Sequence, residues 1–182
     1  MTPQGLISAA YLEEQRKLHA SPRGYGQRGD KWASAVLRLA GKYEATSILD
    51  YGCGAGNLVK AIRPRLPRSV RISEYDPAIA GKDATPSFAD LVVCTDVLEH
   101  IEPERLDAVL AHLKMLARKA IFAVIATRPA KKLLSDGSNA HLIIQDSGWW
   151  KARLLEAGFT LETGPRSPLK VPSNEFSVVL IP

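Results

Sequence analysis

The sequence is poor in the features that mark exported or membrane proteins. Its 182 residues include only two cysteines, Cys53 and Cys94, which is too few for a disulfide framework. Both lie in apolar runs, where a free thiol packs as a small hydrophobic group. The longest apolar run, residues 120–126, is too short to cross a bilayer, and the N-terminal residues lack the apolar core of a secretory signal. We therefore expect a cytoplasmic protein without a membrane partner.

Clustered metal ligands and clustered positive charge are also lacking. The cysteines and histidines show no ligand spacing, so no metal site is predicted. Glu99 is expected to lie with neighbouring acids at a solvated helix start, where acids favour the positive end of the helix dipole. The net charge of +5 would suit an anionic partner, but the basic residues are scattered and no aromatic residues are interleaved with them. A nucleic-acid partner therefore stays open but is not favoured.

What the sequence does contain is an alternation of strand and helix patterns. Short apolar runs predict strands over residues 47–50, 70–75, 91–95 and 120–127. Helical spacing of apolar residues predicts helices over residues 7–19, from 31 to a cap at Gly41, and over 57–63, 103–119 and 148–157. The final strands, 159–163 and 176–181, are joined too briefly for a crossover helix and should pair antiparallel.

This alternation predicts an α/β fold: a doubly wound, mostly parallel sheet with helices on both faces and an antiparallel C-terminal strand. The length suits a single domain over residues 1–182. Within it, residues 1–41 form N-terminal helices and a lid-like loop, and residues 42–182 form the core. The segment between residues 76 and 90 is too short for a complete helix and strand, so one of the two should be reduced.

A glycine-rich turn follows the first predicted strand, in Ile48-Leu49-Asp50-Tyr51-Gly52-Cys53-Gly54-Ala55-Gly56-Asn57. Residues without a Cβ atom let the backbone approach a ligand, and the next helix offers free N–H groups. The spacing is G-x-G-x-G rather than the G-x-G-x-x-G of dinucleotide sites, and no Gly-Lys-Ser/Thr follows as in a P-loop. A carboxylate at Asp50 would repel a diphosphate but suits the ammonium group of an amino acid.

A second acidic signal, Glu74-Tyr75-Asp76, ends the second predicted strand. It lies at roughly the spacing at which an acid meets a ribose hydroxyl. Strand alternation puts Glu74 and Asp76 on one face. We favour Asp76 for the ribose because it lies closest to the strand end, with Glu74 as the alternative. A ligand with a cationic amino-acid end and a ribose indicates S-adenosylmethionine.

Two segments carry a resemblance to a known family. The turn quoted above resembles the first motif of the class I (Rossmann-like) S-adenosylmethionine-dependent methyltransferases. Asp90-Leu91-Val92-Val93-Cys94-Thr95-Asp96-Val97-Leu98-Glu99-His100-Ile101 resembles their fourth-strand motif. Matching elements run from about Trp32 to the C-terminus. The cofactor site predicted on this basis comprises Asp50, Tyr51, Gly52, Cys53, Gly54, Gly56, Glu74, Asp76, Asp83, Thr95 and Asp96.

The resemblance also assigns parts of the cofactor to these residues. It implies that Asp50 and the glycines surround the methionine part and that Asp76 binds the ribose. Asp83 and Ala84 would bracket the adenine, while Thr95 and Asp96 would line the cofactor's other side. One departure from the family pattern is that the third strand and its acidic end are compressed here to residues 81–83.

Histidines are the candidates for acid–base chemistry. Methyl transfer is an in-line displacement, and a hydroxyl acceptor usually needs a general base. His100, just past the strand over residues 91–95, has a suitable unperturbed pKa, although it could instead orient the next helix. His141 follows the next strand by a loop and could close over the acceptor. His19 and His112 are expected to be solvated.

The segment Tyr25-Gly26-Gln27-Arg28-Gly29-Asp30-Lys31-Trp32 has the glycines and mixed polar groups of a lid. N-terminal segments often cover the cofactor in related methyltransferases, which implies that Tyr25 and Trp32 contact the cofactor or the acceptor. The sequence thus predicts a methyltransferase acting on a small molecule, such as a sugar or metabolite hydroxyl. An RNA- or protein-directed methyltransferase and a catalytically silent cofactor-binding protein are the alternatives. The sequence identifies neither the acceptor nor the oligomeric state.

Overall fold

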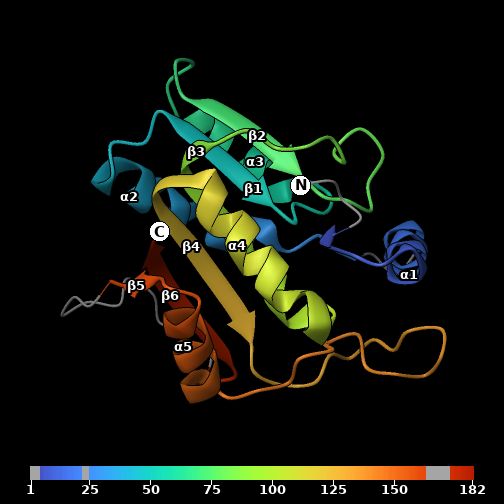
Figure 1. Cartoon of the computed structure of the whole chain (residues 1–182). Coiled ribbons are helices and arrows are strands. Elements are labelled where there is room, and N and C mark those ends of the chain that lie inside the picture. Colours follow the sequence, from blue (N-terminus) through green and yellow to red (C-terminus); the bar gives the residue numbers. More distant parts are fainter. Residues whose placement is uncertain (1–4, 22–24, 163–172) are drawn as a thin grey trace.

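The computed structural model of the chain describes residues 5–21, 25–162 and 173–182. Its centre is a six-stranded sheet in the order β2-β1-β3-β4-β6-β5 (Figure 1). The strands are β1 (Ser47–Tyr51), β2 (Arg71–Tyr75), β3 (Ala89–Thr95), β4 (Ala117–Ala126), β5 (Thr160–Leu161) and β6 (Glu175–Ile181). The first four pair parallel, whereas β6 pairs antiparallel with both β4 and β5. The predicted α/β fold with antiparallel C-terminal strands is confirmed.

Helices cover both faces of this sheet (Figure 1). On one face, α4 (Leu106–Leu116) and α5 (Ser147–Glu156) pack through side chains such as Leu110, Leu113 and Trp150. On the other, α2 (Ala33–Lys42) and α3 (Asn57–Ile62) pack through Val36 and Leu58. The sheet therefore has apolar residues on both faces, which explains why β3 and β4 read as continuous apolar runs rather than alternating ones.

The N-terminal helix α1 (Ala9–Ala20) lies apart from the sheet, as Figure 1 shows. Its N-cap is Ser8, whose hydroxyl accepts a hydrogen bond from the Tyr11 N–H. Two contacts fasten it to the segment after β3: the Ser8 N–H donates to Glu102 Oε2 at 2.8 Å, and the Tyr11 hydroxyl donates to the His100 carbonyl at 2.7 Å. The helix is thus fixed over the edge of the sheet at which β3 ends.

Four short 3₁₀ turns complete the described regular structure: η2 (Gly29–Trp32), η3 (Arg63–Arg65), η4 (Leu98–His100) and η5 (Pro103–Arg105). The compression predicted between β2 and β3 is present and goes further than expected, because residues 76–88 contain neither a helix nor a strand. The predicted helix over residues 103–119 ends at Leu116, since the chain enters β4 directly at Ala117. Both cysteines are free and buried. Within the described ranges, no helix is long and apolar enough to cross a membrane.

Candidate functional site

A cavity of about 590 Å³ opens at the carboxyl ends of the parallel strands. Its walls come from the glycine turn after β1, the segments that follow β2, β3 and β4, and N-terminal residues within 6–19 and 25–31. Open α/β sheets bind ligands at this edge, and the volume falls within the ~300–1,000 Å³ common for small-molecule sites. We therefore expect the predicted site residues to line this cavity.

The glycine turn needs glycine for two reasons. Gly52, Gly54 and Gly56 all have φ between +50° and +74°, a conformation that other L-residues rarely adopt. In addition, a Cβ atom at Gly52 would overlap the side chain of Val97, and one at Gly54 would overlap the carbonyl oxygen of Gly26. That carbonyl also accepts a hydrogen bond from the Ala55 N–H at 2.9 Å. The lid-like loop thus packs directly on the turn.

Gly56 and Glu74 lie behind the turn rather than in the cavity. Gly56 is the N-cap of α3, and a Cβ atom there would overlap the Glu74 carboxylate. Glu74 forms an ion pair with Lys82 at 3.1 Å, and the same ammonium donates to the Gly54 carbonyl at 3.1 Å. Neither Gly56 nor Glu74 lines the cavity, where their predicted contact with a cofactor would require them, and the two lie against one another instead. Lys82, which sequence reasoning did not single out, holds this part of the turn.

Asp50 lies at the end of β1 and lines the cavity, with only 4% of its surface exposed. Burial, together with the nearby Glu74 and Asp76 carboxylates and against the opposing charge of Lys82, raises the pKa of its carboxyl to about 7. No described residue forms an ion pair or hydrogen bond with this carboxylate. A cationic ligand group placed beside it would favour the ionised form, which is the interaction expected of an amino-acid ammonium.

Asp76 is oriented by the backbone. Its Oδ2 accepts a hydrogen bond from the Gly54 N–H and its Oδ1 from the Ala78 N–H, both at 3.0 Å. Its side chain lines the cavity, whereas Glu74 points to Lys82. Of the two acids left open by the sequence, the geometry therefore favours Asp76 for a ribose.

Asp83 does not line the cavity. It is exposed, and its carboxylate accepts a hydrogen bond from the Gly81 N–H of its own loop at 3.2 Å. The structure therefore does not place Asp83 at the cavity, where the predicted adenine contact would require it. The physical reason is the missing regular structure over residues 76–88: no strand carries Asp83 to the edge of the sheet.

The remaining cofactor candidates, Tyr51, Cys53, Thr95 and Asp96, all line the cavity. Asp96 has a left-handed backbone with φ of +56°, which is strained for a residue with a side chain. Its carboxylate pairs with Lys31 at 3.0 Å, and Lys31 also reaches Glu175 at 3.3 Å. The segment after β3 is thereby tied to the N-terminal segment.

A row of rings crosses the cavity from Asp76 to His141. His19 Nε2 lies 3.8 Å from Asp76 Oδ2, and the His19 ring meets Tyr25 with centroids 4.9 Å apart. Tyr25 in turn meets His100 at 5.7 Å, and His100 meets His141 at 4.7 Å, each edge to face. The expectation that His19 is solvated is therefore wrong. In the sequence, His19 stands shortly before the lid-like segment, and this position could have indicated that the His19 side chain reaches the site.

The two candidate bases are both placed at the cavity wall, and both are held in one tautomer. His100 Nδ1 lies 2.7 Å from the Ala140 carbonyl, and His141 Nδ1 lies 2.6 Å from the Arg128 carbonyl. Since a carbonyl only accepts, Nδ1 carries the proton in each ring and Nε2 keeps its lone pair. Burial, with His141 beside it, lowers the pKa of His100 to about 4, and burial also lowers the pKa of His141. Both imidazoles are neutral at pH 7.

Two further side chains that were expected to be solvated are buried instead. Glu99 is not solvated but fully buried, because η4 turns it back toward β4, where its Oε1 accepts from the Ala126 N–H at 3.0 Å. Burial and Asp96 raise its pKa to about 8. His112 is also buried, on the inner face of α4, with its Nδ1 3.0 Å from the Tyr51 hydroxyl.

Trp32, predicted to contact the cofactor or acceptor, does not line the cavity. Its indole is 6% exposed and packs edge to face against Phe122 in the core beneath the sheet. The 3₁₀ turn η2 directs the side chain inward at the point where the lid-like segment ends. Tyr25, by contrast, lines the cavity, and its hydroxyl lies 3.2 Å from His100 Nδ1.

Comparison with known proteins gives a consistent result. A family model described as a methyltransferase domain matches residues 25–163. A search of curated proteins found no match. Among solved structures of similar fold, the DhpI–SAH complex is 15% identical, with a TM-score of 0.65 and coverage of 97% of this chain and 98% of that one.

Two further solved structures share the fold. One is Burkholderia thailandensis 1,6-didemethyltoxoflavin-N1-methyltransferase with bound 1,6-didemethyltoxoflavin and S-adenosylhomocysteine: 17% identity, TM-score 0.65, and coverage of 96% of this chain and 90% of that one. The other is a small RNA methyltransferase: 12% identity, TM-score 0.55, and coverage of 81% of this chain but only 25% of that one.

Proposed function

This chain belongs to the methyltransferase-domain family of class I S-adenosylmethionine-dependent enzymes, and on that premise we propose that its methyl acceptor is a hydroxyl group of a small molecule. The observation that carries the proposal is the cavity, which joins a cofactor half around Asp50 and Asp76 to an acceptor half around His100 and His141.

The residues of the cofactor half fit S-adenosylmethionine, which supplies an electrophilic methyl group when it is bound. Asp50, buried and without a cationic partner among the described residues, suits the ammonium group of the methionine part. Asp76, fixed by the N–H groups of Gly54 and Ala78, keeps lone pairs for the two ribose hydroxyls. Thr95 and Asp96 line the opposite wall.

The acceptor half supplies what a hydroxyl acceptor requires. His100 and His141 each present a ring nitrogen with a free lone pair, because their other nitrogen is bonded to a carbonyl. Such a nitrogen can take the proton of the attacking hydroxyl. The N-terminal segment closes this half: Tyr11, Gln15 and Tyr25 line the same cavity. A covered cavity of this size suits a small acceptor better than a large polymer.

A nucleic-acid acceptor is the second candidate, on one specific observation. Arg128, Lys131 and Lys132 line the cavity on the loop after β4, which places positive charge beside the acceptor half. One structure of similar fold is a small RNA methyltransferase. Binding of an RNA oligonucleotide that weakens strongly with added salt would favour this candidate.

The proposal is tested first by ligand binding and then by transfer. S-adenosylhomocysteine should raise the melting temperature, NAD should not, and Asp76→Ala should reduce the shift. Transfer of labelled methyl from S-adenosylmethionine should then be measured with pools of small hydroxyl compounds, small amines and RNA oligonucleotides. Labelling of amines alone, or of RNA alone, would overturn the hydroxyl small-molecule proposal while leaving the enzyme class intact.

A further inference from the structure

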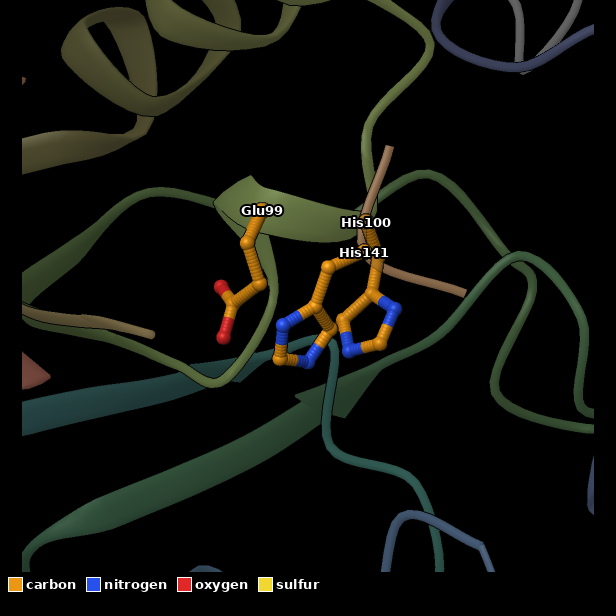
Figure 2. Close-up of side chains that lie close together, drawn as sticks. All are labelled: Glu99, His100 and His141. Atoms are coloured by element: carbon orange, nitrogen blue, oxygen red, sulfur yellow. The ribbon is translucent and has the colours of Figure 1, made fainter. Parts of the chain in front are cut away.

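Three side chains from two separate segments meet beside the cavity. Glu99 and His100 are consecutive residues of η4, and His141 comes from the loop after β4 (Figure 2). One ligand atom from each lies within 4.8 Å of the others. The two segments are held together by the backbone, since the Ile143 N–H donates to the Glu99 carbonyl at 3.0 Å. The cluster is therefore built into the fold rather than formed by long surface side chains.

Glu99 is the unusual member of the cluster, because one of its two carboxylate oxygens lacks a hydrogen-bond partner among the described residues. The side chain is fully buried, and Oε1 accepts from the Ala126 N–H. Oε2 is also buried and has no hydrogen-bond partner among the described residues. A buried carboxylate oxygen without a donor is costly, and native structures seldom keep one without a reason. Protein cores normally supply a donor to such an atom, so the unpaired Oε2 is an available ligand for a cation.

The histidines are already arranged as metal-binding histidines usually are. Each ring donates its Nδ1–H to a backbone carbonyl, of Ala140 or of Arg128, which fixes the ring and leaves Nε2 unprotonated. Among the described residues, no hydrogen bond involves Nε2 of His100 or of His141. In Figure 2 the two rings lie side by side, with a nitrogen of each directed toward the other ring and the Glu99 carboxylate beside them.

We propose that Glu99, His100 and His141 bind one divalent transition-metal ion, through Oε2 of the carboxylate and Nε2 of each imidazole. Two imidazoles and one carboxylate suit Zn²⁺, Mn²⁺, Fe²⁺ or Co²⁺ rather than Mg²⁺, which prefers oxygen ligands. Bonds of ~2.0–2.2 Å require the donor atoms to lie roughly 3.0–3.5 Å apart, so binding draws the cluster together. The proposed site departs from the sequence-based prediction, which found no ligand spacing and therefore expected no metal site.

The position of the ion suggests what it does, and this step rests on the proposed hydroxyl acceptor. Both histidines line the cavity while Glu99 lies behind them, so the coordination positions left open face the acceptor half. An acceptor hydroxyl bound there would lose its proton to solvent water more readily, because the ion stabilises the alkoxide, and the alkoxide oxygen would then take the methyl group while S-adenosylhomocysteine leaves. With the ion in place, the histidines hold it, and the ion rather than an imidazole activates the acceptor.

The test is metal binding by the whole chain, measured independently of activity. After removal of metal with a chelator, Co²⁺ is titrated in and its visible absorption followed, with Zn²⁺ competition and calorimetry for affinity. The wild-type chain should bind one equivalent. Glu99→Gln and His141→Gln should each weaken binding by about 100-fold or more, in excess of the ~10–100-fold typical for residues that only orient a ligand. His19→Gln, a histidine of the same cavity outside the cluster, should leave Co²⁺ binding unchanged.

Binding of S-adenosylhomocysteine is measured in parallel on each variant, which also shows that it is folded. A wild-type chain that binds S-adenosylhomocysteine but no Co²⁺ at 1 mM, a concentration on the order of the weakest physiological metal sites, overturns the metal site and leaves the proposed function standing. Equal Co²⁺ affinity in all variants places the ion elsewhere and also overturns it. Loss of S-adenosylhomocysteine binding in the wild type would instead contradict the proposed function.

Discussion

Cofactor affinity should fall steeply as the pH is lowered through 7, because Asp50 must be ionised to pair with a cationic ligand group. In the free protein, burial holds the pKa of this carboxyl at about 7. A bound ammonium group would lower that pKa, so binding releases a proton wherever the free carboxyl still carries one. Affinity should therefore rise with pH up to about 7 and then level off.

The size of the effect follows from the same pKa. A carboxyl with a pKa of about 7 is ionised to ~1% at pH 5 and to roughly three quarters at pH 7.5. The dissociation constant of S-adenosylhomocysteine should then rise on the order of 50- to 100-fold between pH 7.5 and pH 5, equivalent to ~2.5 kcal/mol. Working below pH 7.5 also keeps the α-amino group of the ligand mostly protonated, since such groups have pKa values of about 8.

Isothermal titration calorimetry in two buffers of different ionisation enthalpy measures both the affinity and the protons released. At pH 6 the release should be about 0.9 proton per site for a pKa near 7. Asp50→Asn keeps the shape of the side chain but cannot ionise, so its affinity should be weak and nearly independent of pH. The His100 pKa of about 4 lies below the range tested. A wild-type affinity that stays constant from pH 5 to 7.5, or a slope that persists in Asp50→Asn, would refute the reasoning.

Three further substitutions test other parts of the site. Lys82→Met removes the cation that lowers the Asp50 pKa, so the midpoint of the same pH profile should move to higher pH, and an unchanged midpoint would contradict the assignment. Gly52→Ala should lower the free energy of unfolding, measured in urea, by ~1–3 kcal/mol, because the φ of +73° strains alanine and its Cβ atom would overlap Val97. Adding Val97→Ala to the same chain should recover part of this loss. Tyr51→Phe should cost ~1–3 kcal/mol by leaving buried His112 Nδ1 unpaired, whereas Tyr51→Phe with His112→Leu should cost less than the single change. Equal losses in the single and double variants would show that the unpaired His112 Nδ1 carries no cost.

The fold could be predicted because its signals are local. The continuous apolar runs of β3 and β4 indicate strands covered on both faces, and the glycines at 52, 54 and 56 indicate a turn at the carboxyl end of β1. Asp50 could be placed for the same reason, since the residue that enters such a turn lies at the edge of the sheet. These inferences need only the order of residues along the chain.

The residues that were misplaced depend on which way a short turn faces. Glu99 looked like a solvated acid before a helix, but η4 directs it inward while its neighbour His100 lines the cavity. Trp32 and Tyr25 belong to one lid-like segment, yet η2 buries the first in the core and leaves the second at the site. His112 is a different case, because it lies in the α-helix α4, where its spacing from Val109 and Leu116 is that of the buried face on which it pairs with Tyr51. Hydrophobic periodicity cannot show such orientations in 3₁₀ turns of three or four residues.

Two buried carboxylates give the site its electrostatic character. Asp50 is 4% exposed and Glu99 is fully buried, and neither forms an ion pair with a described residue. Burial raises the pKa of both, to about 7 and about 8, so each is held in a place where its charged form is unfavourable. A fold selected for stability alone would replace such groups with apolar ones, and local rules of this kind are broken mainly at functional sites. Under the two proposals made above, each acid awaits a cation that arrives after folding: the ammonium group of the cofactor at Asp50 and a metal ion at Glu99.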